Sequence, residues 1–204
     1  MSSQNNPLLA ILNSRRTVFT LQALIMLTGQ KSSKLTKSLH YFASIGKIQN
    51  PRRGIYTKDG YDVEEMACSL FRPSYISMEY VLQRAGVVFQ WDDSITCISY
   101  LTRTVEIDSK NYLFRKIKPE IWIGMDGIEQ HDNIAIASPE RAFLDMVYLS
   151  AGNCYFDNLR PLSVRRIRQI LPLYHSSRLN ERVDYLLNNK KLTRGADKGQ
   201  VRDT

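Results

Sequence analysis

The residue types best suited to contacting DNA are concentrated in the segment KSSKLTKSLHY, residues 31–41. Four of them recur at i, i+3, i+4 and i+7, so a helix would present them on one face. Ammonium, hydroxyl and phenol groups that project together suit contacts to phosphates and to base edges in a groove. This group consists of Lys34, Lys37, Ser38 and Tyr41. Tyr41 taken alone also fits half-buried packing.

Two positions just before these residues extend the candidate surface. Lys31 and Ser33 lie where a helix would begin, and free backbone N–H groups at a helix start favour a phosphate. A further cluster of cations lies in GKIQNPRRGIYTK, residues 46–58, which holds four Lys or Arg and no carboxylate. The candidate DNA contacts are therefore Lys31, Ser33, Lys34, Lys37, Ser38, Tyr41, Arg52 and Arg53.

The elements that would position these side chains are three helices and a hairpin. NNPLLAILNS predicts a helix capped by Asn6, with Pro7 in its first turn. TLQALIMLTG predicts a second helix that begins after Thr20 and stops at Gly29. SKLTKSLHYFASIG predicts a third. Its core face is expected to consist of Leu35, Leu39 and Phe42.

The hairpin is predicted from the short extended runs KIQ and GIYT, with a turn at NPRR between them. Its tip would carry Arg52 and Arg53, which could straddle phosphates or enter a minor groove. Three helices followed by a hairpin predict a winged helix-turn-helix over residues 1–59, in which the hairpin is the wing.

The charge of +8 is distributed unevenly along the chain. Residues 1–58 hold nine Lys or Arg and no Asp or Glu, whereas residues 59–156 hold eight basic and fifteen acidic residues. An ordinary solvated surface mixes both signs, so the first segment favours a polyanionic partner and the second a different one. Two alternatives remain: a merely solvated cationic face, or a winged helix that binds protein.

Composition bounds the class of protein. With 204 residues, of which 43% are hydrophobic and 24% charged, the chain suits one large or two small globular domains. The N-terminus has no cationic stretch followed by an apolar one, and LQALIML is far shorter than the roughly 20 residues of a membrane span. The three cysteines are scattered and form no C-x-x-C pair, as in a reducing compartment. We expect a cytoplasmic protein without a membrane segment.

Residues 60–190 are expected to form a mixed α/β domain with C-terminal helices, followed by a polar flexible tail over residues 191–204. DVEEMACSLF predicts a helix with Asp62 and Glu65 as a capping box, and a second helix is predicted from Ser77 to Ala85. Strand character is found in VVFQW, ITCISYL, NYLFRKI, IWIGM and NIAIA. Helices are then predicted over SPERAFLDMVYL, LSVRRIRQIL and SRLNERVDYLLNN. The predicted fold class is α+β.

No catalytic motif is evident in this second region. The closest approach to a metal-ligand set is Asp126, His131 and Asp132, but these residues fall in a predicted turn, where such types are common. Glu140 and Asp145 are five residues apart, which favours capping and ion pairing over shared catalysis. P-loop, G-x-S-x-G and H-E-x-x-H patterns are absent from the sequence. We expect neither an enzyme nor a bound metal or cofactor.

A second basic cluster near the C-terminus consists of Arg165, Arg166 and Arg168. It is either a solvated helix face or a second nucleic-acid surface that helps to bend DNA or to meet an RNA.

Three stretches resemble a known family, the AbiEi-type antitoxins of AbiE abortive-infection systems, which are classed as type IV toxin–antitoxin pairs. SLHYFASIGKIQNPRRGIYTK resembles the family's recognition helix and wing. PSYISMEYVLQRAGV is similar to the helix that opens its C-terminal domain, and IAIASPERAFLDMVYL to its strand-to-helix element. The stretches keep the family's order. After Glu79 the family usually has small residues, whereas this chain has Tyr80 and Val81, so packing there is expected to differ.

The resemblance implies a DNA-binding N-terminal domain that represses its own operon. It also implies a C-terminal antitoxin domain that counters a nucleotidyltransferase-like toxin. The expected partners are therefore double-stranded promoter DNA and that toxin, which is either contacted directly or has its effect reversed. Two alternatives remain open: a protein- or RNA-binding module that neutralises its toxin by contact, and a solitary transcription regulator.

Overall fold

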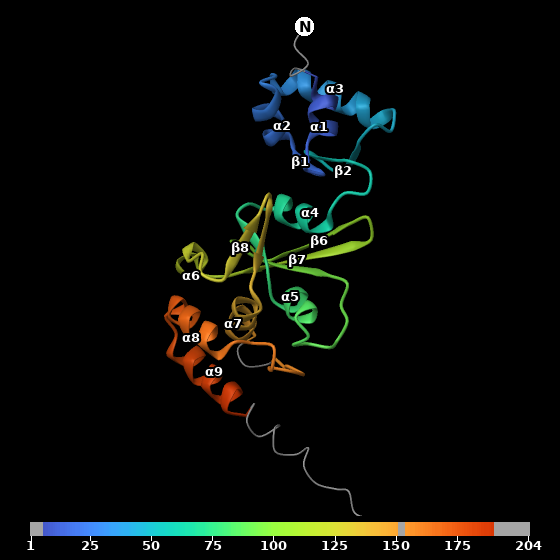
Figure 1. Ribbon diagram of the computed structural model, residues 1–204. Helices are drawn as coiled ribbons and strands as arrows, with labels where there is room; N and C mark the ends of the chain where they lie inside the picture. The colour runs from blue at the N-terminus through green and yellow to red at the C-terminus, as the bar shows by residue number, and fades with distance from the viewer. Residues whose placement is uncertain (1–5, 151–153, 190–204) are drawn as a thin grey trace, which may run out of the picture.

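The computed structural model describes residues 6–150 and 154–189 and has a mixed α and β architecture (Figure 1). We call residues 6–58 the first unit and the described residues from 61 onward the second unit. The elements of the first unit are α1 (Pro7–Asn13), β1 (Val18–Thr20), α2 (Leu21–Thr28), α3 (Ser32–Ser44), β2 (Gln49–Arg52) and β3 (Ile55–Thr57). The predicted tail over residues 191–204 lies outside the described part.

The helices of the first unit begin and end where their capping residues predict. The Asn6 side chain accepts a hydrogen bond from the N–H of Leu8, and the Thr20 hydroxyl accepts one from the N–H of Ala23. Gly29 ends α2 in the left-handed region with φ of 65°, which a glycine adopts without steric cost. These local interactions satisfy backbone groups that a helix end leaves free.

Strand β1 was not predicted, and it changes the sheet of the first unit from a hairpin to three strands in the order β1-β3-β2. Its three residues pair with β3 across 35 to 39 residues of sequence, from Val18 opposite Thr57 to Thr20 opposite Ile55. A run of three residues gives no periodic signal by itself. Long-range pairing therefore decides this element.

The predicted turn of the hairpin at NPRR is wrong by two residues. Asn50 and Pro51 belong to β2, and the turn lies at Arg53 and Gly54, where Gly54 has φ of 79°. The Asn50 side-chain amide donates to the carbonyls of Arg52 and Ile55, so it spans an irregular pairing between the two strands. Pro51 is tolerated because β2 is an edge strand.

The second unit contains a six-stranded sheet in the order β6-β7-β5-β4-β9-β8, in which β5 and β7, and likewise β4 and β9, are parallel. Its elements are α4 (Val63–Leu70), β4 (Ser74–Ile76), α5 (Glu79–Arg84), β5 (Ile95–Ser99), β6 (Arg103–Ile107), β7 (Lys110–Lys116), α6 (Pro119–Ile123), β8 (Ile128–His131), β9 (Ile134–Ala137), α7 (Pro139–Leu149), α8 (Val164–Ile170), η2 (Leu171–Tyr174) and α9 (Ser177–Asn189).

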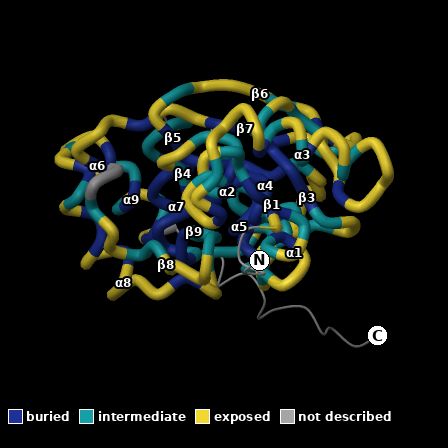
Figure 2. Tube along the Cα trace, turned by 90° about the horizontal axis from the view of Figure 1, so that it is seen from above, coloured by how far each residue is buried: buried dark blue, intermediate teal, exposed yellow. Residues whose placement is uncertain are grey.

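The elements of the second unit are layered. In Figure 1, α4 lies between the first unit and the six-stranded sheet, whereas α5 and α7 lie on the other side of the sheet. Helices α8 and α9 pack against α7 and form the far end of the molecule. Figure 2 shows that buried residues gather in the middle and that exposed residues follow the rim. Among the described residues, no helix has the length and apolar character needed to cross a membrane.

Each unit has its own hydrophobic core, and the two cores meet at the first sheet. The core of the first unit is made of Ile11, Phe19, Leu24, Leu35, Leu39, Ile48 and Tyr56. Phe42, predicted to be buried, is only half-buried and packs at the edge of that core. Val18 and Ile55 belong to the core of the second unit, so β1 and β3 join the two units.

Two strand predictions in the second unit are wrong. VVFQW is a loop, and IWIGM lies largely in α6. In the second case Pro119 at the first helical position and Glu120 in the first turn are helix-start signals that outweigh the β-branched residues. Strands β4, β6 and β8 were not predicted. Strand β4 has only three residues, and β6 and β8 are edge strands with many polar residues, which weakens the alternating pattern.

Candidate nucleic-acid interface and buried polar cluster

Helix α3 presents the predicted cationic face to solvent. Lys31, Lys34 and Lys37 are exposed, and none of them forms an ion pair with any described residue. Tyr41 is 60% exposed, with its ring centroid 5.7 Å from that of Phe42. Because Leu35 and Leu39 are fully buried, the opposite face of the helix holds these groups outward.

The two serines of the candidate surface differ in availability. Ser33 is exposed in the first turn of α3, next to backbone N–H groups, and Lys31 before the helix makes no side-chain cap. Ser38 is half-buried, and its hydroxyl donates to the carbonyl of Lys34 at 3.2 Å. Ser38 can still accept a hydrogen bond, but its donor is engaged within the helix.

The paired arginines of the hairpin point to different partners. Arg53 is exposed at the turn, as predicted. The guanidinium carbon of Arg52 lies 5.7 Å from the centroid of the Phe71 ring, which belongs to the second unit. This contact is a cation–π interaction. Arg53 is therefore the free cation of the tip, whereas Arg52 helps to hold the hairpin against the second unit.

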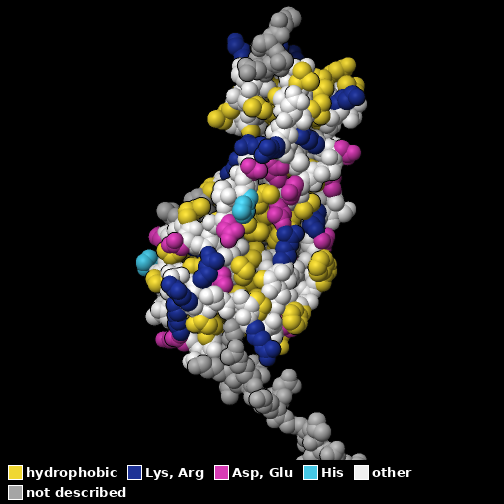
Figure 3. All heavy atoms as spheres, viewed as in Figure 1, with side chains coloured by type: hydrophobic (Ala, Val, Ile, Leu, Met, Phe, Trp, Pro, Cys, Tyr) yellow, Lys and Arg dark blue, Asp and Glu magenta, His cyan; other side chains and the backbone are white. Residues whose placement is uncertain are grey.

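The remaining cations of the first unit also divide into one that is held by protein groups and others that are exposed. The Lys58 ammonium donates to the carbonyls of Leu12 and Ser14, at 3.2 and 2.5 Å, and so stabilises the C-terminal end of α1. Arg15, Arg16 and Lys47 are exposed. In Figure 3 the carboxylates, in magenta, begin only at the junction below the first unit. The described part of the first unit therefore carries an uncompensated positive field.

A buried carboxylate fixes the first unit to the second. Glu65 of α4 is 5% exposed, and its Oε2 accepts hydrogen bonds from the Thr17 N–H at 2.7 Å and the Thr17 hydroxyl at 2.6 Å. The same oxygen accepts from the Val18 N–H at 3.3 Å, and Oε1 accepts from the Asn133 amide at 2.9 Å. The predicted capping box is therefore only half correct. Asp62 caps α4, but Glu65 binds Thr17 and Val18 at the start of β1 and Asn133 between β8 and β9.

The second unit has a charged cluster in its core that was not predicted. Arg141 and Asp145 of α7 are both fully buried and form an ion pair of 3.5 Å. Asp145 also accepts hydrogen bonds from the hydroxyls of Ser77 at 2.7 Å, Tyr174 at 2.6 Å and Tyr75 at 3.0 Å. A buried charge is tolerated when it is paired and hydrogen-bonded in this way. The cluster joins β4, α7 and η2.

The same cluster holds the segment that contains α6. The Arg141 guanidinium donates to the carbonyls of Ile121 at 2.9 Å, and of Gly124 and Asp126 at 3.1 Å each. Burial raises the pKa of Asp145, and Arg141 together with the three hydroxyl donors offsets part of that rise. The paired motif was detectable in ERAFLD, since Arg141 and Asp145 are four residues apart on one helix face.

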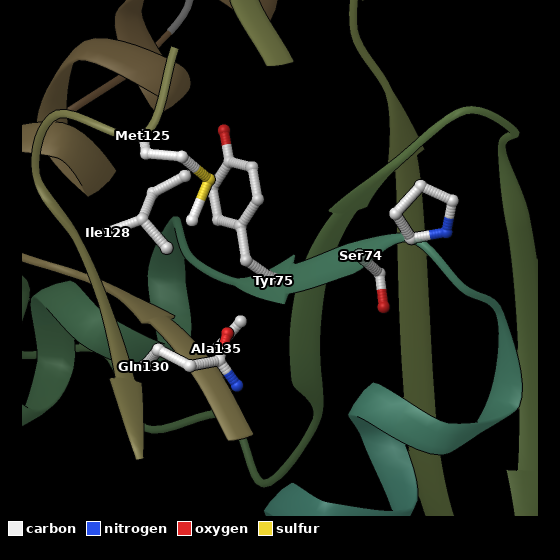
Figure 4. Close-up of a pocket in the computed structure, with 7 residues that line it drawn as sticks. Ser74, Tyr75, Met125, Ile128, Gln130 and Ala135 are labelled. Atoms are coloured by element: carbon white, nitrogen blue, oxygen red, sulfur yellow. The ribbon is translucent and has the colours of Figure 1, made fainter. Parts of the chain in front are cut away.

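A pocket of about 350 Å³ adjoins this cluster. Figure 4 shows Met125 and Ile128 beside the ring of Tyr75, with Gln130 and Ala135 below them. Burial raises the pKa of Tyr75 well above its usual value, and the nearby Asp145 adds to the rise. Tyr75 is therefore a neutral phenol that Asp145 and Arg141 hold in place, and not an activated nucleophile.

The other candidate residues are not brought together. Among the described residues, no group of three His, Cys, Asp or Glu could hold a metal ion, so Asp126, His131 and Asp132 do not converge. In the second basic cluster, Arg168 pairs with Asp184 of α9. Arg165 and Arg166 are exposed and have no ion pair in the described part of the chain.

Comparison with models of known protein families finds no match to this chain, and a search of curated proteins finds no significant similarity.

Proposed function

We propose that the protein binds double-stranded DNA through α3 and the β2–β3 hairpin and represses the transcription of its own operon. In this proposal α2 and α3 are the helix-turn-helix, α3 is the recognition helix, and the hairpin is the wing. The second unit is the antitoxin domain, which counters a nucleotidyltransferase-like toxin. The activity requires neither catalysis nor a cofactor and takes place in the cytoplasm.

One observation carries the DNA-binding half of the proposal. Lys31 just before α3, and Lys34 and Lys37 on the exposed side of α3, form no ion pair within the described part of the chain, and residues 6–58 contain no carboxylate. Unpaired lysines on a helix that is held by a buried opposite face suit insertion beside a phosphate backbone. Arg53 adds a cation at the hairpin turn, where it would contact an adjacent groove or phosphate.

The antitoxin half rests on the resemblance to AbiEi-type antitoxins. Two of the stretches that carry this resemblance, PSYIS and SPERAFLD, are far apart in sequence but meet in the buried cluster. Tyr75 and Ser77 of the first stretch donate hydrogen bonds to Asp145 of the second. This contact gives both stretches a shared structural role in the core of the second unit.

Binding to the promoter of the protein's own operon, measured by fluorescence anisotropy, tests the DNA-binding half. If Lys31, Lys34, Lys37 and Arg53 each contact a phosphate, the plot of log affinity against log salt should have a slope of about −3.6. The promoter fragment should bind at least tenfold more tightly than a scrambled fragment of the same length. Equal affinity for the two fragments would show that the protein is no operator-specific repressor.

The antitoxin half has a separate test. The full chain and a Lys34→Ala/Lys37→Ala variant are each expressed beside the toxin encoded in the same operon, both from a foreign promoter. Growth should be rescued by both proteins, because the proposal assigns these lysines to DNA and not to the toxin. Failure of the full chain to rescue growth would remove the antitoxin assignment and leave the DNA-binding assignment standing.

A further inference from the structure

The loop of residues 87–94 exposes two large aromatic side chains. Phe89 is 66% and Trp91 is 83% exposed, although their sequence predicts a strand with a buried face. Val87, which anchors the start of the loop, is fully buried. Exposure of a tryptophan to this extent leaves apolar surface in water that a partner would cover.

The loop is held in place by hydrogen bonds that its backbone donates and accepts. The Phe89 N–H donates to Asp157 Oδ2 at 2.8 Å, and the Gln83 amide donates to the Gln90 carbonyl at 2.6 Å. Asp93 forms an ion pair with Lys110 of β7. An ordered loop loses little conformational entropy when it binds, so its aromatic side chains are suited to act as anchors.

A hollow of about 380 Å³ lies beside these aromatic residues. At one edge of the hollow, Arg84 is bound by an aromatic ring and a carboxylate. The loop could offer the same two kinds of group to an arginine of a partner. The guanidinium carbon of Arg84 lies 4.2 Å from the centroid of the Tyr80 ring, and Arg84 also pairs with Glu64. An aromatic face next to a carboxylate is a good site for a guanidinium.

The charges around the hollow favour a cationic partner. Its two cations, Arg84 and Lys110, are neutralised by Glu64 and Asp93. Asp92 at the rim, and Asp157 beneath the loop, have no cation partner among the described residues. The resulting excess of negative charge opposes a nucleic acid and attracts Lys or Arg.

We propose that Phe89, Trp91 and Asp92 form a docking surface for a protein partner that presents arginine among apolar residues. Aliphatic side chains of the partner cover Phe89, while a guanidinium stacks on Trp91 and pairs with Asp92. This surface is separate from α3, so DNA binding and docking can fail independently. Assignment of the partner as a cationic nucleotidyltransferase-like toxin rests on the proposed function.

The test measures binding of the full chain to a labelled peptide of about twelve residues in which arginine and leucine alternate, a spacing that offers both contact types. Phe89→Ser/Trp91→Ser should weaken this binding by about tenfold or more, because aromatic anchors dominate interface energy. Asp92→Asn should weaken it by about threefold at low salt and have little effect at high salt. Tyr185→Ser, which changes a 68% exposed tyrosine on α9, is the matched control and should bind as the unmodified protein does.

Three results would overturn the proposal. The first is equal peptide binding by the Phe89→Ser/Trp91→Ser variant and the unmodified protein. The second is tight binding of a thymidine oligonucleotide that the same variant loses, which would make the loop a stacking platform for single strands. The third is a change of oligomeric state in that variant by sedimentation velocity, which would make a second copy the occupant. Circular dichroism verifies that each variant is folded.

Discussion

Replacing Glu65 with alanine is expected to loosen the first unit from the second. The carboxylate receives four hydrogen bonds, from the Thr17 N–H and hydroxyl, the Val18 N–H and the Asn133 amide. Each buried donor left without an acceptor costs about 1–3 kcal/mol, and water can reach those that are only part-buried. We therefore expect a loss of about 3 kcal/mol in the free energy of unfolding.

Thermal unfolding and limited proteolysis measure this effect. For a chain of this length, about 3 kcal/mol corresponds to a fall in Tm of about 6–12 °C. Trypsin should also cleave faster after Lys58, which precedes the turn between the units, because opening there becomes easier. Glu65→Gln keeps an oxygen acceptor for the β1 donors and should lose only about 1 kcal/mol.

Glu106→Ala is the matched control, because Glu106 is exposed on β6. It should change neither Tm nor the rate of cleavage. If Glu65→Ala unfolds within about 1 °C of the unmodified protein and is cleaved no faster, the buried carboxylate does not hold the units together.

Three further predictions follow from the geometry. In DNA titrations, Arg53→Ala should reduce the magnitude of the slope of log affinity against log salt by about one, whereas Arg52→Ala should leave this slope nearly unchanged. Equal changes of slope in the two variants would contradict the contact of Arg52 with the second unit. In urea denaturation, Asp145→Asn should lower the free energy of unfolding by about 3 kcal/mol because a buried cation loses its counter-charge, and a loss below about 1 kcal/mol would contradict the ion pair. Burial raises the pKa of Cys68 to about 11, so a disulfide reagent at pH 8 should modify half-buried Cys154 first. The rate of modification of Cys68 should rise about tenfold per pH unit. If Cys68 in the folded protein reacts as fast as in the unfolded protein, its burial is contradicted.

Local signals in the sequence account for most of the first unit. The ends of the helices are marked by local residues. The side chains of Asn6 and Thr20 accept hydrogen bonds from backbone N–H groups two and three residues further on, and Gly29 adopts the left-handed conformation that ends α2. Strand β1 carries no such signal, since its three residues become a strand only by pairing with β3. The hairpin turn was predicted two residues too early, because an Asn-Pro pair usually marks a turn. In the structure Asn50 and Pro51 belong to the irregular edge strand β2.

The second unit was harder to predict because its polar contacts are long-range. Asp145 and Ser77 are 68 residues apart, so the sequence around neither residue predicts the hydrogen bond between them. Arg141 and Asp145 have the i, i+4 spacing of an ion pair on one helix face, so this part of the cluster was predictable from the sequence. Similarly, Glu65 matched the spacing of a capping box, yet its carboxylate accepts three hydrogen bonds from Thr17 and Val18 at the start of β1.

The sequence predicted that the lysines of α3 are exposed, and the structure shows which cations of the first unit are held by other side chains or carbonyls. Spacing alone placed the lysines of α3 on one exposed face. It could not distinguish Arg52 from Arg53, because the ring of Phe71 that receives Arg52 comes from the second unit. Tertiary contacts thus decide which cations remain free for a ligand.

The salt dependence of operator binding by a Lys34→Ala/Lys37→Ala variant tests the central claim most directly. Loss of two phosphate contacts should reduce the magnitude of the slope by about two and weaken binding to promoter and scrambled DNA alike. Lys116→Ala/Lys118→Ala removes two exposed cations from the second unit and should leave the slope unchanged. Identical slopes for the α3 variant and the unmodified protein would contradict the assignment of α3 to the DNA backbone.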